Sequence, residues 1–416
     1  MKAYPIIAFA FTIALVGCQP SADLTPTEPN LRALSEEEQQ LSEATGKFVL
    51  DLFQQLYDPA KANQFFSPLS IHQALSMTMN GNEGEVLEEF VNVLRYEGLS
   101  LEQANSGSRD LRDFLLQVDP KVKLAIANAI WYKKQYQVQV PFRQTAQDYF
   151  GAEIAGLEML DPQSVNIIND WIEKQTNHLI QDMLDYIPPD AVMYLVNAIY
   201  FKGDWQYQFD PQKTKKEPFH TAPGQSIQVD MMDLGNASTF SINSSNSFYY
   251  LEIPYSTGQY SMGVLYHPEG KIDQVASLLN WENLQAWRKN SMKSNLILKM
   301  PRFKLRQKMD NMKDDLIAMG LQRPFYFDPA NFTKLFSNPT EELKISRVIH
   351  DAMIEVDEKG SEAAAATLVE VIEKTSSGPS EPWVLSLDKP FVFFIQEKHS
   401  GAILFLGKLG NPNQPE

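Results

Sequence analysis

Histidine, cysteine and paired acidic residues are the side chains that most often bind metals or move protons in proteins. The sequence contains six histidines, and no two of them are two, three or four residues apart. Its single cysteine cannot complete a metal site with them. Acidic runs such as Glu36–Glu38 are typical of a solvated helix face. We therefore expect no metal site and assign no catalytic residue.

The motifs that bind phosphate groups or expose a nucleophile are also missing from the sequence. It has no GxSxG and no GxGxxG, and Gly401–Lys408 is one residue too long for a Walker loop and lacks the Ser or Thr that should follow. The net charge of -16 repels nucleic-acid phosphates, and the basic cluster Lys213–Lys216 is short. The sequence thus predicts no cofactor and no nucleic-acid partner, and it disfavours an enzyme.

One segment near the C-terminus has a pattern suited to a different chemistry. Val348–Asp357 is predicted to be a strand, but no turn follows it. From 361 to 371 every second residue is small or β-branched and uncharged, whereas Glu362 and Glu370 lie on the other face. The four alanines at 363–366 would also suit a short exposed helix. The alternation indicates that 361–372 could enter a sheet with its carboxylates left in solvent.

The stretch Glu358–Thr367 closely resembles the hinge of inhibitory serpins, whose reactive loop inserts into the main sheet as a new central strand. Other stretches resemble motifs of the same family, in family order, from about residue 36 to 410. These stretches are Asn63–Ile71, Asn197–Trp205, Met300–Phe303, Lys389–Phe393 and Phe405–Lys408.

The resemblance implies an α+β fold in a single serpin domain at 36–416, with three β-sheets, about nine helices and an exposed reactive loop at about 358–388. It also implies a serine protease inhibitor that acts as a suicide substrate. The target protease would be trapped as a covalent acyl-enzyme when the loop inserts. We expect a monomer whose partner is a trypsin-like serine protease, or a cysteine protease.

The resemblance also assigns residues to the moving parts of the family. The hinge positions fall on Glu358, Gly360, Ser361, Glu362, Ala363, Ala364, Ala365, Ala366 and Thr367. The polar shutter beneath the opening sheet falls on Ser67, Ser70, Asn197 and His350. Trp205 matches the residue near the start of insertion, and simple core packing would explain it equally well.

The family's usual spacing, counted from Glu358, places the reactive bond at Lys374–Thr375. A lysine on the acyl side would suit a trypsin-like pocket with a buried carboxylate. The neighbouring acid Glu373 and the long stretch Thr375–Asp388 depart from the family pattern, so Thr375–Ser376 is the alternative bond.

Two other functions compete with inhibition. A non-inhibitory serpin with a binding or chaperone role would be expected to carry bulky or charged residues in its hinge, and none stands on the small-residue face between Ser361 and Thr367. A secreted hydrolase would need a site assembled from scattered residues, such as a serine with His350.

The N-terminus predicts export from a bacterial cell. Lys2 precedes the apolar run Ile6–Val16, which is too short to span a bilayer and is typical of a signal peptide. Leu15–Cys18 resembles a lipobox, which implies a signal peptide at 1–17 and a lipidated Cys18 with a Pro/Ser/Thr-rich tether at 18–35. We expect anchoring at the cell envelope, in the outer membrane on its periplasmic or cell-surface side. The alternative is a plain signal peptide with an incidental cysteine.

These functional residues must be positioned by a mixture of helices and strands. The capping box at Ser35 and apolar helical spacing predict a helix from 36 to 56, Ser67-Pro68 starts a second helix, and 164–179 is a third. Strands are predicted at 122–132, 192–201, 248–254, 260–266, 295–303, 390–396 and 402–409. The continuous apolar run at 192–201 indicates a strand covered on both faces.

Overall fold

The computed structural model describes residues 28–189, 191–244, 247–337, 343–345, 347–361 and 382–415. Within these residues the helices are α1 Glu36–Leu56, α2 Pro68–Met79, α3 Gly84–Val93, α4 Leu101–Gln117, α5 Val140–Phe150, α6 Gln163–Gln175, α7 Ile272–Leu278, α8 Trp281–Lys289, α9 Lys313–Ala318 and the 3-10 turn η1 Arg323–Phe325. The strands are β1 Asn63–Phe66, β2 Lys123–Lys133, β3 Glu153–Leu157, β4 Met193–Asp204, β5 Lys215–Ala222, β6 Gln225–Asp233, β7 Ser238–Asn243, β8 Tyr249–Pro254, β9 Tyr260–Tyr266, β10 Met292–Pro301, β11 Phe303–Met309, β12 His350–Val356, β13 Gly360–Ser361, β14 Trp383–Ser386, β15 Phe391–Glu397 and β16 Ile403–Leu409.

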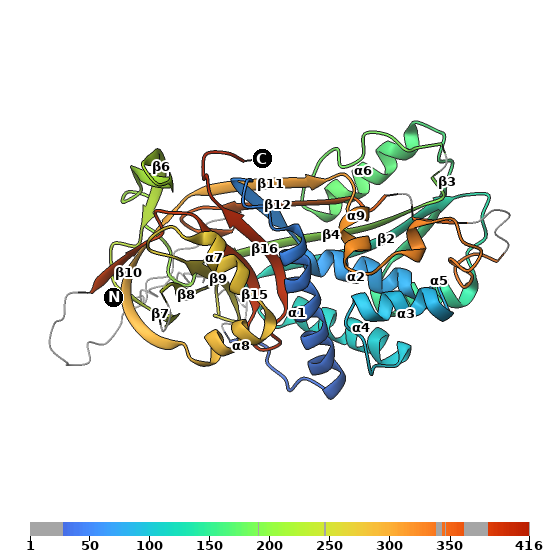
Figure 1. The fold of residues 1–416 in the computed structure, drawn as a ribbon, viewed down its shortest axis with the longest axis horizontal. Coiled ribbons are helices and arrows are strands. Elements are labelled where there is room, and N and C mark those ends of the chain that lie inside the picture. Colours follow the sequence, from blue (N-terminus) through green and yellow to red (C-terminus); the bar gives the residue numbers. More distant parts are fainter. Residues whose placement is uncertain are drawn as a thin grey trace, which may run out of the picture.

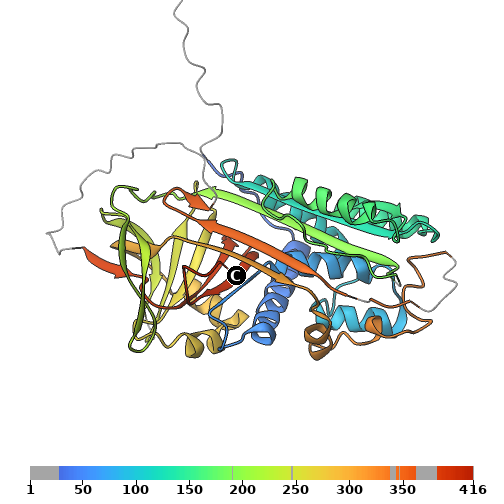
Figure 2. The same cartoon turned by 90° about the horizontal axis from the view of Figure 1, so that it is seen from above.

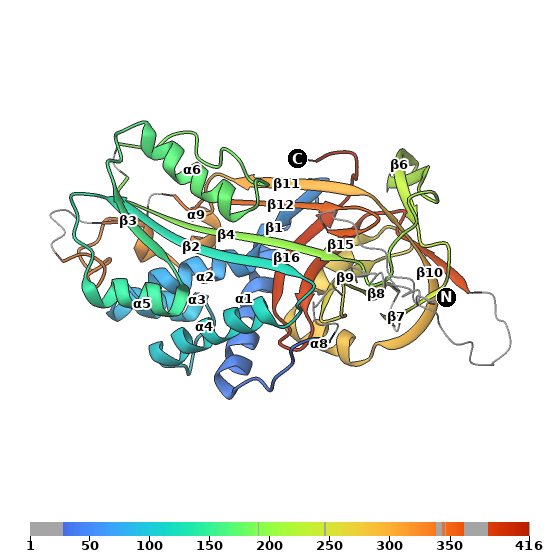
Figure 3. The same ribbon diagram turned by 180° about the vertical axis from the view of Figure 1, so that it is seen from behind.

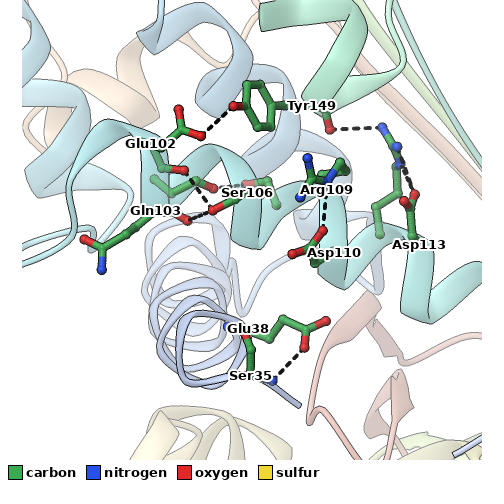
Figure 4. A network of polar contacts seen from close by, with 12 residues as sticks. Ser35, Glu38, Glu102, Gln103, Ser106, Arg109, Asp110, Asp113 and Tyr149 are labelled. Carbon is green, nitrogen blue, oxygen red and sulfur yellow. Dashed lines mark hydrogen bonds and ion pairs between the residues drawn. The ribbon is translucent and has the colours of Figure 1, made fainter. Parts of the chain in front are cut away.

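The helix starts follow the signals in the sequence. Figure 4 shows the hydrogen bond from the Ser35 backbone N–H to the Glu38 carboxylate, and the Ser35 hydroxyl accepts from the Glu38 N–H, so the predicted capping box is present. The Ser67 side chain caps α2. The third predicted helix, α6, ends at Gln175 rather than at 179. Asn177 and His178 adopt left-handed φ values of 51° and 64°, which stop an α-helix.

The described strands form a ten-stranded and a six-stranded sheet. In the larger one, β10 pairs with β7 at its start and with β6 and β14 at its end. Two of the three expected sheets are therefore joined through this long strand. The six-stranded sheet has the order β11-β12-β13-β4-β2-β3, in which only β2 and β3 run parallel.

The strand β4 lies in the interior, as its continuous apolar run predicts. Helix α2 covers one face of it and α6 the other, and both helices flank the long strands in Figures 1 and 3. Figure 2 shows the same layers from above. Two apolar clusters, one around α2 and one beneath α6, fill the space on either side. The described residues form a single α+β domain. None of the described helices is both long and apolar enough to cross a membrane.

The N-terminal segment before α1 is attached to one end of this domain. The Asn30 N–H donates to the carbonyl of Val118 at the end of α4 (2.8 Å). The next residue, Asp119, accepts a hydrogen bond from the Thr257 hydroxyl (2.6 Å) in the turn between β8 and β9. The Ser256 N–H of that turn donates to the carbonyl of Asp204 at the end of β4 (2.8 Å).

Candidate functional site

The six-stranded sheet is joined across its middle by a strand of two residues. Gly360 and Ser361 of β13 pair with Asp204 and Gly203 of β4, and Ser361 also pairs with Val356 of β12. Within the described residues no other ladder connects β4 to β12. The first residues of the predicted hinge are therefore already inside the sheet, and Ser361 is only 2% exposed.

Glycine is required at the first of these two positions. A Cβ atom on Gly360 would lie 2.0 Å from the carbonyl oxygen of Gly203 and 2.7 Å from Cα of Asp204. Both neighbours are backbone atoms of β4, so they cannot move aside as a flexible side chain could. The close approach of the two strands thus depends on the missing side chain.

The turn that leads into β13 is held by charged and polar contacts. The buried carboxylate of Glu358 accepts hydrogen bonds from the guanidinium of Arg302 and from the hydroxyl of Thr214. Burial opposes the charge of Glu358, but these hydrogen bonds, a backbone hydrogen bond and the positive charge of Arg302 together lower the pKa of the carboxyl group. Asp357 accepts from the N–H groups of Lys359 and Gly360. The predicted hinge residue Glu358 is thus fixed to Arg302, between β10 and β11, and to Thr214 in the segment that follows β4.

Trp205 lies where β13 enters the sheet. Its indole N–H donates to the carbonyl of Asp357 (2.9 Å), and its backbone N–H donates to the carbonyl of Lys359 (2.6 Å). Its ring also stacks on Tyr255, with centroids 4.3 Å apart and planes 13° from parallel. Trp205 therefore contacts the hinge and also packs within the core.

Sequence reasoning did not identify Tyr255, although its hydroxyl forms a 2.8 Å hydrogen bond with the hydroxyl of Ser361. The two residues are 106 positions apart. Tyr255 follows an apolar strand in which a buried tyrosine is ordinary. No local pattern could have indicated that its hydroxyl meets the hinge.

The four predicted shutter residues lie together near the start of β12, away from β13. The Ser67 N–H donates to Nε2 of His350 (2.9 Å), and the Ser67 hydroxyl donates to the carbonyl of Leu404 (2.7 Å). The Ser70 N–H donates to the Ser67 hydroxyl (3.3 Å). Ser70, Asn197 and His350 line one cavity of about 40 Å³. The structure brings these residues together, and their role in sheet opening stays a prediction.

The electrostatics of this cluster require a neutral imidazole. Burial lowers the pKa of His350 to about 4, and its Nε2 atom must be unprotonated to accept from Ser67. The side-chain N–H of Asn197 donates to Asn128 and Gln73, whereas its Oδ1 atom is buried and has no hydrogen-bond partner in the described chain. The cluster is therefore not fully satisfied in this conformation.

Several predicted residues lie outside the described part of the chain. They are Cys18, the hinge residues Glu362, Ala363, Ala364, Ala365, Ala366 and Thr367, and the reactive-bond residues Lys374 and Thr375. Among the residues that are described, no group of three His, Cys, Asp or Glu side chains could hold a metal ion.

Comparisons with known proteins agree with this geometry. Residues 43–412 match the model of the family described as Serpin (serine protease inhibitor). An uncharacterized serpin-like protein of Methanosarcina mazei is 31% identical, over 99% of both chains. Human serpin B4 is also 31% identical, over 89% of this chain and 99% of its own. The crystal structure of human thyroxine-binding globulin complexed with its ligand has a TM-score of 0.80 at 26% identity, and covers 90% of this chain and 99% of that one.

Proposed function

This chain belongs to the serpin family, and from that premise we propose that it inhibits a serine protease by acting as a single-use substrate. The observation that carries the proposal is the open six-stranded sheet. In the described residues β4 and β12 are connected only through Gly360 and Ser361. A chain segment that continues from Ser361 would find strand edges on both sides.

The proposed mechanism is a competition between hydrolysis and strand insertion. The protease serine attacks a loop carbonyl, the peptide bond breaks, and the acyl group stays on the serine oxygen while the new amine takes a proton. Insertion of about a dozen residues between β4 and β12 would gain on the order of 10 kcal/mol, at roughly 0.5 to 1.5 kcal/mol per net hydrogen bond. If insertion is faster than deacylation, the protease is carried along and trapped.

The residue expected on the acyl side of the cut suggests which kind of protease is the target. Lys374 on the acyl side of the cut would enter a trypsin-like pocket, with Thr375–Ser376 as the alternative bond. To test this we would mix the full-length chain with trypsin and examine the products on a denaturing gel. We expect a stable adduct of summed mass and a small C-terminal fragment that starts at Thr375. Lys374→Ala should abolish the adduct with trypsin.

A pair of hinge variants separates trapping from simple cleavage. Thr367→Arg places a charge on the face predicted to be buried, and Glu370→Arg places one on the face predicted to stay in solvent. We expect the first variant to be cleaved without an adduct and the second to keep inhibiting. Cleavage of the unchanged chain without an adduct, across serine and cysteine proteases of several specificities, would instead favour a binding role. The similarity to thyroxine-binding globulin keeps that alternative open.

We also propose that the protein is exported and anchored to the cell envelope through Cys18. The lipobox-like stretch and the proline-rich tether support this, and the attachment of Asn30 to Val118 gives the tether a defined end on the domain. Growth with a labelled fatty acid should label the protein. Cys18→Ser should abolish the label, and a label that persists in this variant would exclude Cys18 as the modified residue.

A further inference from the structure

We propose that Tyr255 is a positioning residue that holds the hinge inside the sheet before any protease has cut the loop. Its hydroxyl forms a 2.8 Å hydrogen bond with the hydroxyl of Ser361, the last described residue of β13. This role deepens the inhibitory function proposed above, and its kinetic consequence depends on that function.

The tyrosine ring is fixed on several sides, so its hydroxyl has a defined position. Tyr255 is fully buried, stacks on Trp205 and meets the ring of Phe201 edge-on at a centroid distance of 5.1 Å. Its backbone N–H donates to the carbonyl of Tyr260 (2.9 Å). A side chain held in this way loses little further freedom when it binds Ser361.

The buried hydroxyl groups of Tyr255 and Ser361 are hydrogen-bond partners of each other. Ser361 is also buried, and within the described residues Tyr255 is the only side chain to which its hydroxyl is hydrogen-bonded. If the hinge left the sheet, the Tyr255 hydroxyl would remain beneath Trp205 without this partner. Because an unsatisfied buried hydroxyl is costly, the pair favours the inserted hinge.

An inserted hinge gives the strand a starting point. Fixing the backbone of a residue costs conformational entropy, and for Gly360 and Ser361 this cost is met before cleavage. After acyl-enzyme formation, insertion can therefore extend an existing strand instead of starting a new one. We expect the inserted hinge to speed up strand insertion, which must be faster than deacylation if the protease is to be trapped.

Hydrogen exchange of the full-length chain tests the position of the hinge without any protease. The variants are Tyr255→Phe, Ser361→Ala and the double variant, and the measured peptide contains residues 357–361. We expect about 2- to 10-fold faster exchange in each single variant, the range that one lost hydrogen bond allows. The double variant should be no faster than the singles, because both changes remove the same bond.

Tyr260→Phe is the matched control. Tyr260 is equally buried, packs on the same Phe201 ring, and donates its hydroxyl to the carbonyl of Leu115 instead of to the hinge. Its substitution should leave exchange at 357–361 unchanged. Unchanged exchange in Tyr255→Phe, or the same increase in Tyr260→Phe, would overturn the positioning role.

The kinetic consequence is read separately, with a protease that forms the adduct. Tyr255→Phe should raise the number of inhibitor molecules consumed per trapped protease by about 2-fold or more, while the rate constant for the first attack on the loop stays the same. If the number of inhibitor molecules consumed per trapped protease does not change, the inserted hinge does not speed up insertion. If no protease forms an adduct with the unchanged chain, the inhibitory function fails, and the exchange experiment still decides whether Tyr255 holds the hinge.

Discussion

Buried histidines make the stability of this protein depend on pH. Burial lowers the pKa of His350 to about 4, against about 6.5 in an unfolded chain. Because the folded value is the lower one, the stabilisation is complete above about pH 6.5 and is lost as the pH falls toward 4. His72 is also buried, and its pKa is likewise lowered to about 4.

We therefore predict a fall of about 2 kcal/mol in the free energy of unfolding between pH 7 and pH 5 from His350 alone. Denaturant unfolding at the two pH values would measure it. His350→Gln should remove that part of the pH dependence, whereas His178→Gln, a change in an exposed side chain, should not. An equal pH dependence in His350→Gln and the unchanged chain would contradict the assignment.

The ion pair of Arg302 with Glu358 should stabilise the hinge more than an exposed pair would. Arg302→Ala leaves a nearly buried carboxylate without its cation, so we expect a loss of about 1 to 3 kcal/mol in unfolding free energy. Lys304→Ala removes a half-exposed pair between Lys304 of β11 and Glu355 of β12, and should cost less than about 1 kcal/mol. Equal losses would mean that burial of Glu358 does not matter.

Among the elements, β13 is the one that closes the sheet, and it depends on glycine. In Gly360→Ala the new Cβ would meet the backbone of Gly203, so the strand should be unable to form. We expect the bond after Lys359 to become sensitive to trypsin. Gly107→Ala, in the middle of α4 with neighbours no closer than 3.4 Å, should leave it protected. Protection of Lys359 in Gly360→Ala would show that β13 tolerates a side chain.

Some elements follow from local signals in the sequence, and others depend on the tertiary structure. The capping box predicted the start of α1, and the continuous apolar run at 192–201 predicted β4, because these signals are local. The end of α6 was misplaced, since Asn177 and His178 take left-handed conformations that their residue types only permit. The contact between Tyr255 and Ser361 joins distant parts of the chain, so it required the tertiary structure.

For the whole molecule, the open sheet predicts that a cleaved chain is more stable than an intact one. A protease that cuts the loop without being trapped should release 362–374 for insertion between β4 and β12. The gain of on the order of 10 kcal/mol should raise the melting temperature by roughly 10 to 20 °C. Calorimetry before and after cleavage measures the change. Thr367→Arg should show no increase, and a lower melting temperature in the cleaved unchanged chain would contradict insertion.

The hydrogen bond of Asn30 places the described start of the chain and the hinge at the same end of the molecule. Asn30 binds Val118, and hydrogen bonds lead from Asp119 through the Ser256-Thr257 turn to Asp204, which pairs with Gly360. If Cys18 carries a lipid as proposed, the twelve residues up to Asn30 span at most about 40 Å. A tether of this length would keep the end of the domain that carries the hinge near the membrane surface. The inhibitor would then meet proteases on that membrane at a high effective concentration, even where few copies are present.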